Sequence, residues 1–498
     1  QVEQHGLSVI AQFWALGAMA AQAAARSVQT LPSSAWAPAE AGAFQVLRGI
    51  APLWITGGWV RDKLLECTDA NPAAHREWER VRTLAGCTFG DVDVLVDGIS
   101  GKDFFFKVKK HDALRAALLG PPVLVRAQGA RSLDTVKLRL PERDIDVTSL
   151  LDAQRHRAEL EGKPRPTKSS SSGCSWSSLV EDAGHRDTTF NACYYDPSTE
   201  EVVDPCGRGL ADLRAGLVRM PHTKGAAVSI AEDPVRLLRC LRFAARFDFR
   251  LDDELSMEPS ATDLGAVPPG RLLNELKKAM LLHNRPGRFL GLLGGPGEVH
   301  RTLFSEAGPS TLESWHAAVG RVNRLESLVL EGISRGNLTA RSVHWRGRPA
   351  HGPPPALLAT DWRKTGIHEN DWAELLLAAL FWKCDETSLK AAGAQLQLSL
   401  AMTDTVGKLQ REARQKMITV QSAPPGAHLL NAAVASSESP ASFWDRWPAA
   451  PAGGSGDSAE PVGGVERAPA RRPRTPKPWP PPQQVEVEER GGEPTEQK

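Results

Sequence analysis

The chain has 498 residues, 41% of them hydrophobic, so it is long enough for several domains with ordinary apolar cores. The formal net charge of +1 is close to neutral, yet residues 207–250 hold eight Arg and one Lys against four acids, so a local basic patch could meet a polyanion. Seven scattered cysteines, none of them in CxxC, exclude a disulfide framework and a zinc site and indicate reduced thiols inside a cell.

Residues 1–45 are expected to form an N-terminal extension. Leu7–Ala25 is apolar and rich in Ala, but two glutamines interrupt it and no basic residue precedes it, so a signal peptide or a membrane span is disfavoured. The absence of acids between Glu3 and Glu40 leaves the remnant of a transit peptide open. The sequence favours a poorly ordered or helical extension.

The stretch ITGGWVRDKLL (Ile55–Leu65) predicts a strand, a tight turn and a helix. Adjacent glycines weaken both strands and helices, so Gly57 and Gly58 indicate a turn or a close approach of the backbone to a ligand. If the helix begins there, its free amides could bind phosphate oxygens, and Arg61 would add a positive charge. Residues Glu66–Phe89, which follow, are expected to be a surface loop.

The motif GDVDVLVD predicts a strand on which Asp91 and Asp93 point to one face. TVKLRL (Thr135–Leu140) and DIDVTSL, which starts at Asp144, predict a hairpin whose second strand could lie beside the first motif. Asp146 would then be a third carboxylate at the same site. Converging carboxylates favour divalent cations, and two such ions suit nucleotidyl transfer, where one activates the attacking hydroxyl and one neutralises the triphosphate.

The rest of the chain is predicted to be mostly helical. Lys163–Ser178 is polar and of low complexity, which predicts a mobile loop. A helical period begins near Ser229 and continues to about Ala433, with Arg346–Pro355 as a linker. Ser436–Lys498 is rich in Pro, Gly, Glu and Ser, which predicts disorder.

The segment SIAEDPVRLLRCLRFAARF (Ser229–Phe247) predicts a helix with two different faces. Ser229 and Glu232 fit a capping box, and Asp233 before Pro234 fits a cap followed by a proline in the first turn. One face is apolar, and the other carries a stripe of arginines with no acid between them. Such a stripe repels itself, so we expect it to have an anionic partner. The stripe consists of Arg236, Arg239, Arg242 and Arg246.

These motifs together resemble the class II tRNA nucleotidyltransferases, the CCA-adding enzymes, and the related bacterial poly(A) polymerases. The resemblance rests on GGWVRD, DVDVLVD, HRDTTFNA, VVDPCGRGLADL and EDPVRLLRCLRFAARF, which occur in the family's order between about Ile55 and Leu293. It implies that Gly57, Gly58 and Arg61 bind the triphosphate. It also implies Mg²⁺ ions on Asp91 and Asp93.

The resemblance extends to the nucleotide. Arg186 and Asp187 would contact the sugar and phosphates of the incoming nucleotide. Asp233 and Arg236 would read the base, because cytosine and adenine each place an amine donor beside a ring-nitrogen acceptor, whereas uracil and guanine reverse this pattern. The residues that support this base-reading pair would be Arg239 and Arg242.

The expected fold is α+β: a polymerase-beta-like mixed-sheet nucleotidyltransferase head over residues 46–220, a helical neck over 221–300, a helical body and tail over 301–435, and a disordered segment over 436–498. The expected function is template-independent addition of CCA to the 3′ end of tRNA from CTP and ATP, with release of pyrophosphate. The expected partners are tRNA, CTP and ATP, without DNA or membrane.

Two alternatives stay open on the sequence alone. The first is a poly(A) polymerase, or an enzyme that adds only CC or only A, because these share the catalytic motifs. The second is a catalytically silent RNA-binding protein of the same fold, although a silent chain has no reason to keep two mutually repelling acids at Asp91 and Asp93. The compartment is expected to be mitochondrion or plastid, nucleus and cytoplasm, or several of these.

Overall fold

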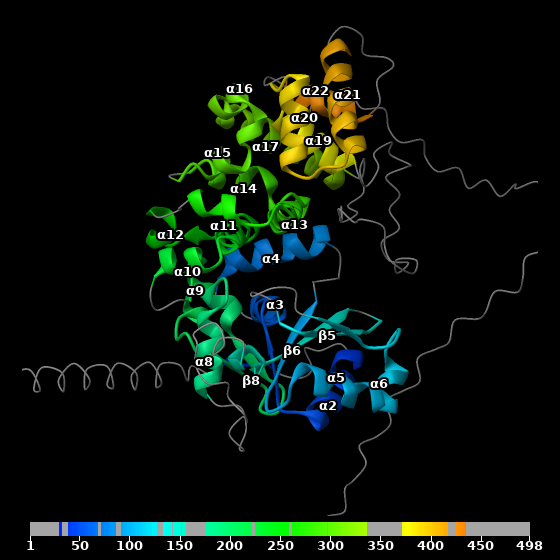
Figure 1. The fold of residues 1–498 in the computed structure, drawn as a ribbon. Coiled ribbons are helices and arrows are strands. Elements are labelled where there is room, and N and C mark those ends of the chain that lie inside the picture. The colour runs from blue at the N-terminus through cyan, green and yellow to red at the C-terminus, as the bar shows by residue number, and fades with distance from the viewer. Residues whose placement is uncertain are drawn as a thin grey trace, which may run out of the picture.

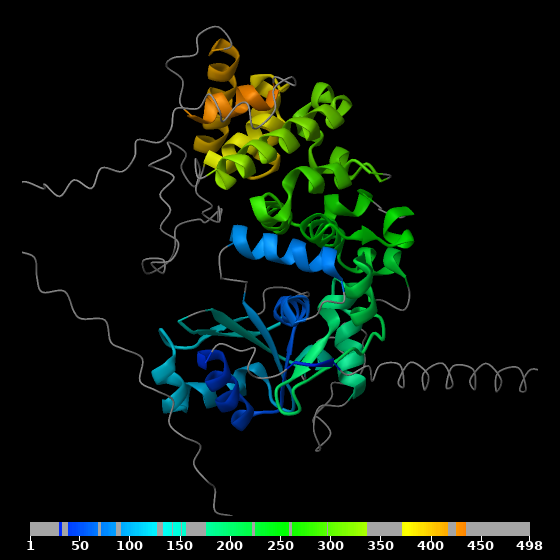
Figure 2. The same cartoon turned by 180° about the vertical axis from the view of Figure 1, so that it is seen from behind.

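A sheet-containing head is followed by helices stacked above it, and together they form an elongated, curved molecule (Figures 1 and 2). This computed structural model describes residues 29–31, 38–67, 71–85, 91–126, 133–141, 143–150, 152–155, 176–221, 225–257, 261–295, 297–335, 371–416 and 425–434. The predicted mixed-sheet head followed by helices is confirmed. Among these residues, no helix is both long and apolar enough to cross a lipid bilayer.

The head is built on an eight-stranded sheet with the order β1-β8-β7-β2-β3-β6-β5-β4. β3 and β6 are parallel neighbours, and the other neighbouring pairs are antiparallel. The predicted hairpin is therefore present as β5 and β6, and its second strand lies beside the GDVDVLVD strand as expected. The strands are β1 (Gln29–Thr30), β2 (Leu53–Thr56), β3 (Val92–Val96), β4 (Val123–Val125), β5 (Thr135–Arg139), β6 (Asp144–Ser149), β7 (Tyr194–Asp196) and β8 (Glu201–Val203).

The alternation of residue types along the central strands determines which face carries acids. Val92, Val94 and Val96 are fully buried, and Asp93 between them points to the opposite face. β6 alternates in the same way, with Ile145 buried beside Asp146. Because successive side chains of a strand point to opposite faces, burial of the apolar residues places both acids on one accessible face.

The head begins before residue 46. β1 pairs with β8, and Leu31, Phe44 and Leu47 are buried in the head core. Residues described between 29 and 50 thus belong to the head, earlier than the expected domain boundary, and the rest of the expected extension lies outside the described residues. The head helices are α2 (Pro38–Ile50), α3 (Gly58–Cys67), α4 (Pro72–Ala85), α5 (Gly101–Lys110), α6 (Asp112–Ala117), α8 (Trp176–Gly184), η2 (Thr189–Ala192) and α9 (Gly209–Ala215).

The expected surface loop at Glu66–Phe89 is wrong for most of its length, because it contains helix α4. Asn71 Oδ1 accepts hydrogen bonds from the amides of Ala73 and Ala74 at 3.1 and 3.0 Å, which caps the helix before Pro72. Trp78 is buried on the inner face of α4. The apolar residues of α4 recur at helical spacing, so the insertion folds onto the protein.

The predicted mobile loop at Lys163–Ser178 ends too late, because α8 begins at Trp176; its other residues lie outside the described ranges. The predicted linker Arg346–Pro355 and the tail Ser436–Lys498 also lie outside them.

The predicted capping box is wrong as well. Ser229 lies inside α10 and is buried, and Gly225 stands at its N-cap.

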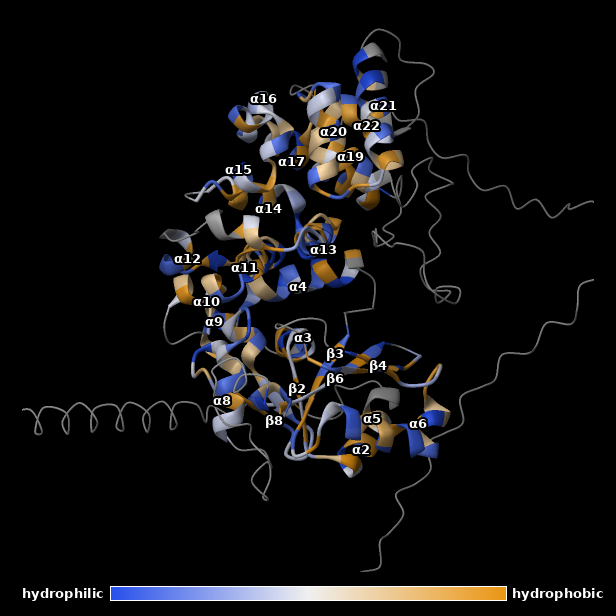
Figure 3. Ribbon diagram, in the orientation of Figure 1, coloured by the Kyte–Doolittle hydropathy of each residue, from blue (hydrophilic) through white to orange (hydrophobic). Residues whose placement is uncertain are grey.

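The helical half follows the period predicted from Ser229 onward. Near its start, β10 (Arg250–Leu251) pairs in parallel with β9 (Leu217–Val218), which lies at the end of the head. Figure 3 shows hydrophobic and hydrophilic residues alternating along these helices. The elements are α10 (Ala226–Glu232), α11 (Val235–Phe247), α12 (Asp253–Met257), η3 (Ala261–Ala266), α13 (Pro269–Ala279), η4 (Leu282–Asn284), α14 (Pro286–Leu293), α15 (Val299–Leu303), η5 (Ser305–Ala307), α16 (Pro309–Glu313), α17 (Trp315–Ser334), α19 (Asp371–Leu380), α20 (Glu386–Gln395), α21 (Leu400–Lys416) and α22 (Pro425–Val434).

Candidate active site

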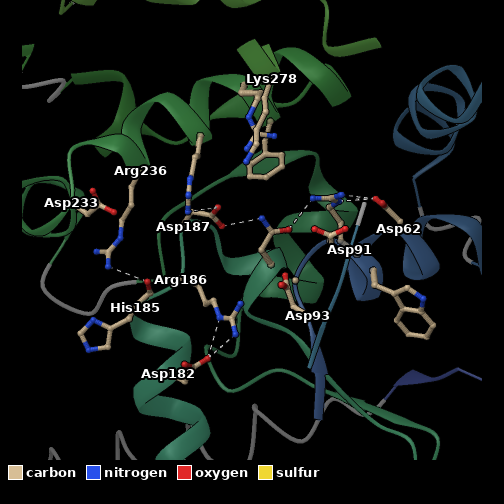
Figure 4. Close-up of a pocket in the computed structure, with 18 of the residues that line it drawn as sticks. Asp62, Asp91, Asp93, Asp182, His185, Arg186, Asp187, Asp233, Arg236 and Lys278 are labelled. Atoms are coloured by element: carbon tan, nitrogen blue, oxygen red, sulfur yellow. Dashed lines mark hydrogen bonds and ion pairs between the residues drawn. The ribbon is translucent and has the colours of Figure 1, made fainter. Parts of the chain in front are cut away.

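A cavity of about 960 Å³ lies between the head sheet and the helices α11 and α13. Figure 4 shows acidic side chains from the head and arginines from the neck directed into it. One predicted site residue, Asp146, is not part of its lining. The predicted residues that do line it are Gly57, Gly58, Arg61, Asp91, Asp93, Arg186, Asp187, Asp233, Arg236, Arg239 and Arg242.

Asp91 and Asp93 form the acidic floor of the cavity (Figure 4). Burial and the charge of Asp146 raise the pKa of Asp91. Burial and the neighbouring carboxylates raise the pKa of Asp93 to about 6, against the attraction of Arg186. The Asp93 side chain is open to the cavity but enclosed by protein around it, so its charge lacks full hydration. Carboxylates in this state are suited to a divalent cation.

Asp146 is held differently from the other two acids. It stands directly opposite Asp93 in the parallel register of β3 and β6. Lys137 Nζ, from β5, lies 2.8 and 2.6 Å from its two carboxylate oxygens. Among the described residues, no three His, Cys, Asp or Glu side chains form a group that could hold a metal ion. Asp146 therefore lies close enough to raise the pKa of both other acids, while Lys137 balances its charge.

The glycine turn lies against this pair. Thr56 is opposite Asp93 in the antiparallel register of β2 and β3, and Gly57 follows with a φ of +74°, a conformation that favours glycine. Helix α3 then begins at Gly58, as predicted, and its N-terminal end faces the cavity. The free amides of a helix N-terminus attract anions, so this end of the cavity suits phosphate.

Arg61 is less available than the sequence suggested. Its Nε and Nη2 donate to Asp62 Oδ1 at 2.9 and 2.7 Å, and its Nη1 donates to Asn191 Oδ1 at 3.0 Å. Its guanidinium carbon lies 5.2 and 4.9 Å from the ring centroids of Phe243 and Phe247 on α11. The side chain is buried, so it joins head to neck as well as lining the cavity.

Arg186 and Asp187 extend the cavity wall from the loop after α8. Arg186 pairs with Asp182, which raises the arginine's pKa although burial opposes its charge. Asp187 Oδ1 accepts from Asn191 Nδ2 at 2.9 Å, and its Oδ2 lies 4.0 Å from Arg239 Nη1. Asp182 and Asn191 were not predicted, although both stand within five residues of the HRD motif.

The arginine stripe of α11 faces the cavity, and two of its members are buried. Arg236 Nη1 donates to the hydroxyl of Ser229 at 2.9 Å, and its Nη2 donates to the carbonyl oxygen of His185 at 3.0 Å. Burial lowers the pKa of Arg246 to about 9. The stripe is therefore not a solvated surface, because its arginines line the cavity and three of them pair with acids of the protein, Glu232 and Glu275.

Helix α13 supplies partners that the sequence analysis missed. Arg271 donates two hydrogen bonds to Asp233, of 3.0 and 2.9 Å, which lower the pKa of Asp233 although burial opposes its ionisation. Glu275 accepts from Arg239 and Arg242 at 3.1 and 3.2 Å, and these charges overcome burial and lower its pKa to about 2. The spacing of Arg271 and Glu275 places them on one helix face, which was the only signal available in the sequence.

The head has the mixed-sheet fold of the nucleotidyltransferases, and the cavity lies at its sheet. Residues 53–219 match the family model described as "Poly A polymerase head domain". Over this head, the chain is similar to the family of class II CCA-adding enzymes and poly(A) polymerases, as the sequence motifs indicated.

Two relatives show a similarity of the same kind. The chain is 31% identical over 305 residues to a tRNA nucleotidyltransferase of Schizosaccharomyces pombe, a match that covers 58% of this chain and 54% of the relative. It is 30% identical over 212 residues to the mitochondrial CCA tRNA nucleotidyltransferase of Saccharomyces cerevisiae, with 41% and 33% covered. The chain thus spans about half or less of these relatives' length.

A solved structure of a CCA-adding enzyme with CTP superposes with a TM-score of 0.50 at 18% identity, covering 84% of each chain. At this identity the likeness establishes the fold alone. The mixed-sheet head and the helical half are therefore both shared with a CCA-adding enzyme.

Proposed function

We propose that the protein adds CCA to the 3′ end of tRNA, using CTP and ATP without a nucleic-acid template. The observation that carries the proposal is the shared cavity: the pair Asp91 and Asp93, the glycine turn, and the base-reading pair Asp233 and Arg236 all line it. A site that must hold cations, triphosphate and base at once needs these three parts side by side.

The tRNA 3′-hydroxyl would attack the α-phosphate of the nucleotide, and pyrophosphate would leave. Mg²⁺ held by Asp91 and Asp93 would neutralise the charge of the attacking and leaving oxygens. The raised pKa values of both acids support this, because a cation offsets the loss of hydration and the repulsion that raise them. Gly57, Gly58 and Arg61 would orient the triphosphate.

The choice of base would be made by the protein. Asp233 would accept a hydrogen bond from the exocyclic amine of cytosine or adenine, and Arg236 would donate to the ring nitrogen. Uracil and guanine would set a carbonyl oxygen against Asp233 and an N–H group against Arg236, and this mismatch in a half-buried site disfavours them. Arg239 and Arg242 would support the pair from the same helix. Arg186 and Asp187 would contact the sugar and phosphates.

The domain roles follow from this arrangement. The head over residues 46–220, extended by β1 and α2, would carry catalysis, the neck over 221–300 would select the nucleotide, and the body over 301–435 would grip the tRNA backbone. Binding should then weaken with salt, because phosphate contacts release counterions. Action in mitochondrion or plastid, nucleus or cytoplasm fits the tRNA substrate, and the Saccharomyces relative is named mitochondrial.

A poly(A) polymerase is the second candidate, because the matching family model is described by that activity. A tRNA that lacks its 3′ CCA, incubated with CTP and ATP singly and together, separates the two. We expect CTP alone to add a short run of C and both nucleotides together to add CCA and stop. Unlimited addition of A from ATP alone would establish the second candidate instead, and no addition at all would indicate a silent chain.

A further inference from the structure

Helix α4, the unexpected helix of the insertion, lies between the head sheet and the helices of the neck in both views (Figures 1 and 2). Its first turn is fixed to the head. Asn71 Nδ2 donates to the carbonyl oxygen of Arg214 at 2.8 Å. His75 Nδ1 lies 2.8 Å from the carbonyl oxygen of Leu65, at the end of the helix that follows the glycine turn.

The other end of α4 is fixed to the neck by Arg80. Its Nη2 donates to the carbonyl oxygens of Arg246 and His283 at 3.0 and 3.1 Å. Its Nε donates to Glu77 Oε2 at 2.7 Å, and Glu77 Oε1 accepts from Arg285 Nη2 at 2.6 Å. Each of these partners is part of α4 itself or of the neck elements α11, η4 and α14.

These bonds have a clear physical role. The carbonyl groups in the last turn of a helix lack partners within the helix, and a cation near that end is favourable. Arg80 satisfies the carbonyl of Arg246 in the last turn of α11 from outside the helix. Trp78 and Val81, buried on the same helix, pack α4 into the core. Because Arg80 is itself largely buried, its charge depends on these partners.

The position of α11 determines the geometry of the cavity. Its arginines form one wall, while Gly57 and Asp93 belong to the head on the other side. We propose that Arg80 is a positioning residue: through α4 it holds the C-terminal end of α11 at a fixed distance from the head, which aligns the base-reading residues with the catalytic pair. This inference rests on the proposed function, because its main readout is nucleotide addition.

The test compares Arg80→Ala, Arg80→Lys and the matched control Arg82→Ala, whose side chain lies on the same helix and is 53% exposed. We measure kcat and KM for CTP with a tRNA that lacks CCA, and the selectivity for CTP over UTP. Arg80→Ala should lower kcat and the selectivity by about 10- to 100-fold each, because small displacements of a positioning group carry such costs. KM should change less, since the head contacts to the triphosphate stay in place.

The conservative variant Arg80→Lys distinguishes a positioning role of Arg80 from loss of the folded structure. Arg80→Lys should recover part of kcat, because an ammonium can still reach one of the two carbonyls. The melting temperature of Arg80→Ala should stay within about 3 °C of wild type, the shift that about 1 kcal/mol causes in a folding unit of about 150–250 residues. Equal kinetics for Arg80→Ala and Arg82→Ala would overturn the proposal. So would a fall in apparent kcat that merely follows loss of folded protein and leaves the selectivity for CTP over UTP unchanged.

Hydrogen exchange supplies a readout that does not need catalysis. Backbone amides of residues 244–250 and 282–285 should exchange about tenfold faster in Arg80→Ala than in Arg82→Ala, because the end of α11 loses its outside partner. Unchanged exchange would overturn the proposal. If the wild-type protein adds no nucleotide, the proposed function fails, while the exchange measurement still decides whether Arg80 fixes α11.

Discussion

A β-carbon added to Gly57 would lie 2.6 Å from Oδ2 of Asp93, closer than real side chains approach. The first glycine of the pair therefore serves two needs, a left-handed φ of +74° and room for the Asp93 carboxylate. A β-carbon on Gly58 would meet only Arg61 Nη2, at 3.4 Å. The two adjacent glycines thus differ in how strictly they are required.

Gly57→Ala should accordingly be far more harmful than Gly58→Ala. We expect Gly57→Ala to cost about 1–3 kcal/mol of stability through backbone strain and to weaken Mn²⁺ binding, because Asp93 must move. Gly58→Ala is the matched control and should keep a near-native melting temperature and Mn²⁺ affinity. Calorimetry on both variants measures this. Equal losses of melting temperature and Mn²⁺ affinity in the two variants would show that contact with Asp93 is not the reason for glycine at position 57.

The lysine bound to Asp146 predicts unequal roles for the three acids. Asp91→Asn and Asp93→Asn should each reduce nucleotide incorporation by about 100- to 1,000-fold, with tRNA binding nearly intact. Asp146→Asn should cost less than about tenfold, because Lys137 already neutralises that carboxylate. Asp112→Asn, an exposed position on the head, is the control. If Asp146→Asn reduces nucleotide incorporation as much as Asp93→Asn does, Asp146 is a third ligand of the cations.

Arg271 should control the choice of base, because it holds Asp233 through two hydrogen bonds. Arg271→Ala should lower kcat/KM for CTP by about 10- to 100-fold, the range that corresponds to losing a charge-assisted pair, and reduce discrimination against UTP. Arg271→Lys should recover little, since one ammonium cannot reproduce the paired geometry. Arg301→Ala, a half-exposed arginine at the start of the body, should behave as wild type. If Arg271→Ala still discriminates against UTP as wild type does, Asp233 does not read the base.

Glu326 on α17 should make stability depend on pH. Burial raises its pKa to about 6 from an ordinary value of 4.5, so the folded state holds its proton more tightly than the unfolded state. Its stabilising contribution is present below pH 4.5 and is lost as the pH rises through 6, a change of about 2 kcal/mol. Urea unfolding of wild type and Glu326→Gln at several pH values measures this.

The free energy of unfolding of wild type, minus that of Glu326→Gln, should fall by about 2 kcal/mol between pH 4.5 and 7. The control is Glu331→Gln, a more exposed residue of the same helix that pairs with Arg335. A difference that stays constant over this range would mean that Glu326 keeps an ordinary pKa in the folded protein.

The local features of the head were predictable because they depend on short-range patterns. The period-two alternation of β3 and β6 placed Asp93 and Asp146 on one face, and the paired glycines marked the turn before α3. Helix α4 was not predicted although Asn71 and Pro72 are ordinary start signals, because an insertion of this length between two elements is also typical of a surface loop.

The partners of the site residues could not be predicted in the same way. Asn191 meets Arg61, and Arg271 meets Asp233, only after distant segments pack together. Lys137 lies opposite Asp146 in the register of β5 and β6, so the register of the hairpin would have predicted this ion pair. A single sequence does not specify that register, so the neutralised third acid became visible only in the structure.

The central claim is that Asp91 and Asp93 hold cations beside a base-reading edge made by α11. A crystal of the protein soaked with Mn²⁺ and CTP measures this most directly, through the anomalous signal of the metal. The account predicts metal between the two aspartates, the triphosphate at the glycine turn, and the cytosine edge against Asp233 and Arg236. Metal absent from that pair, or a cytosine bound away from α11, would contradict it.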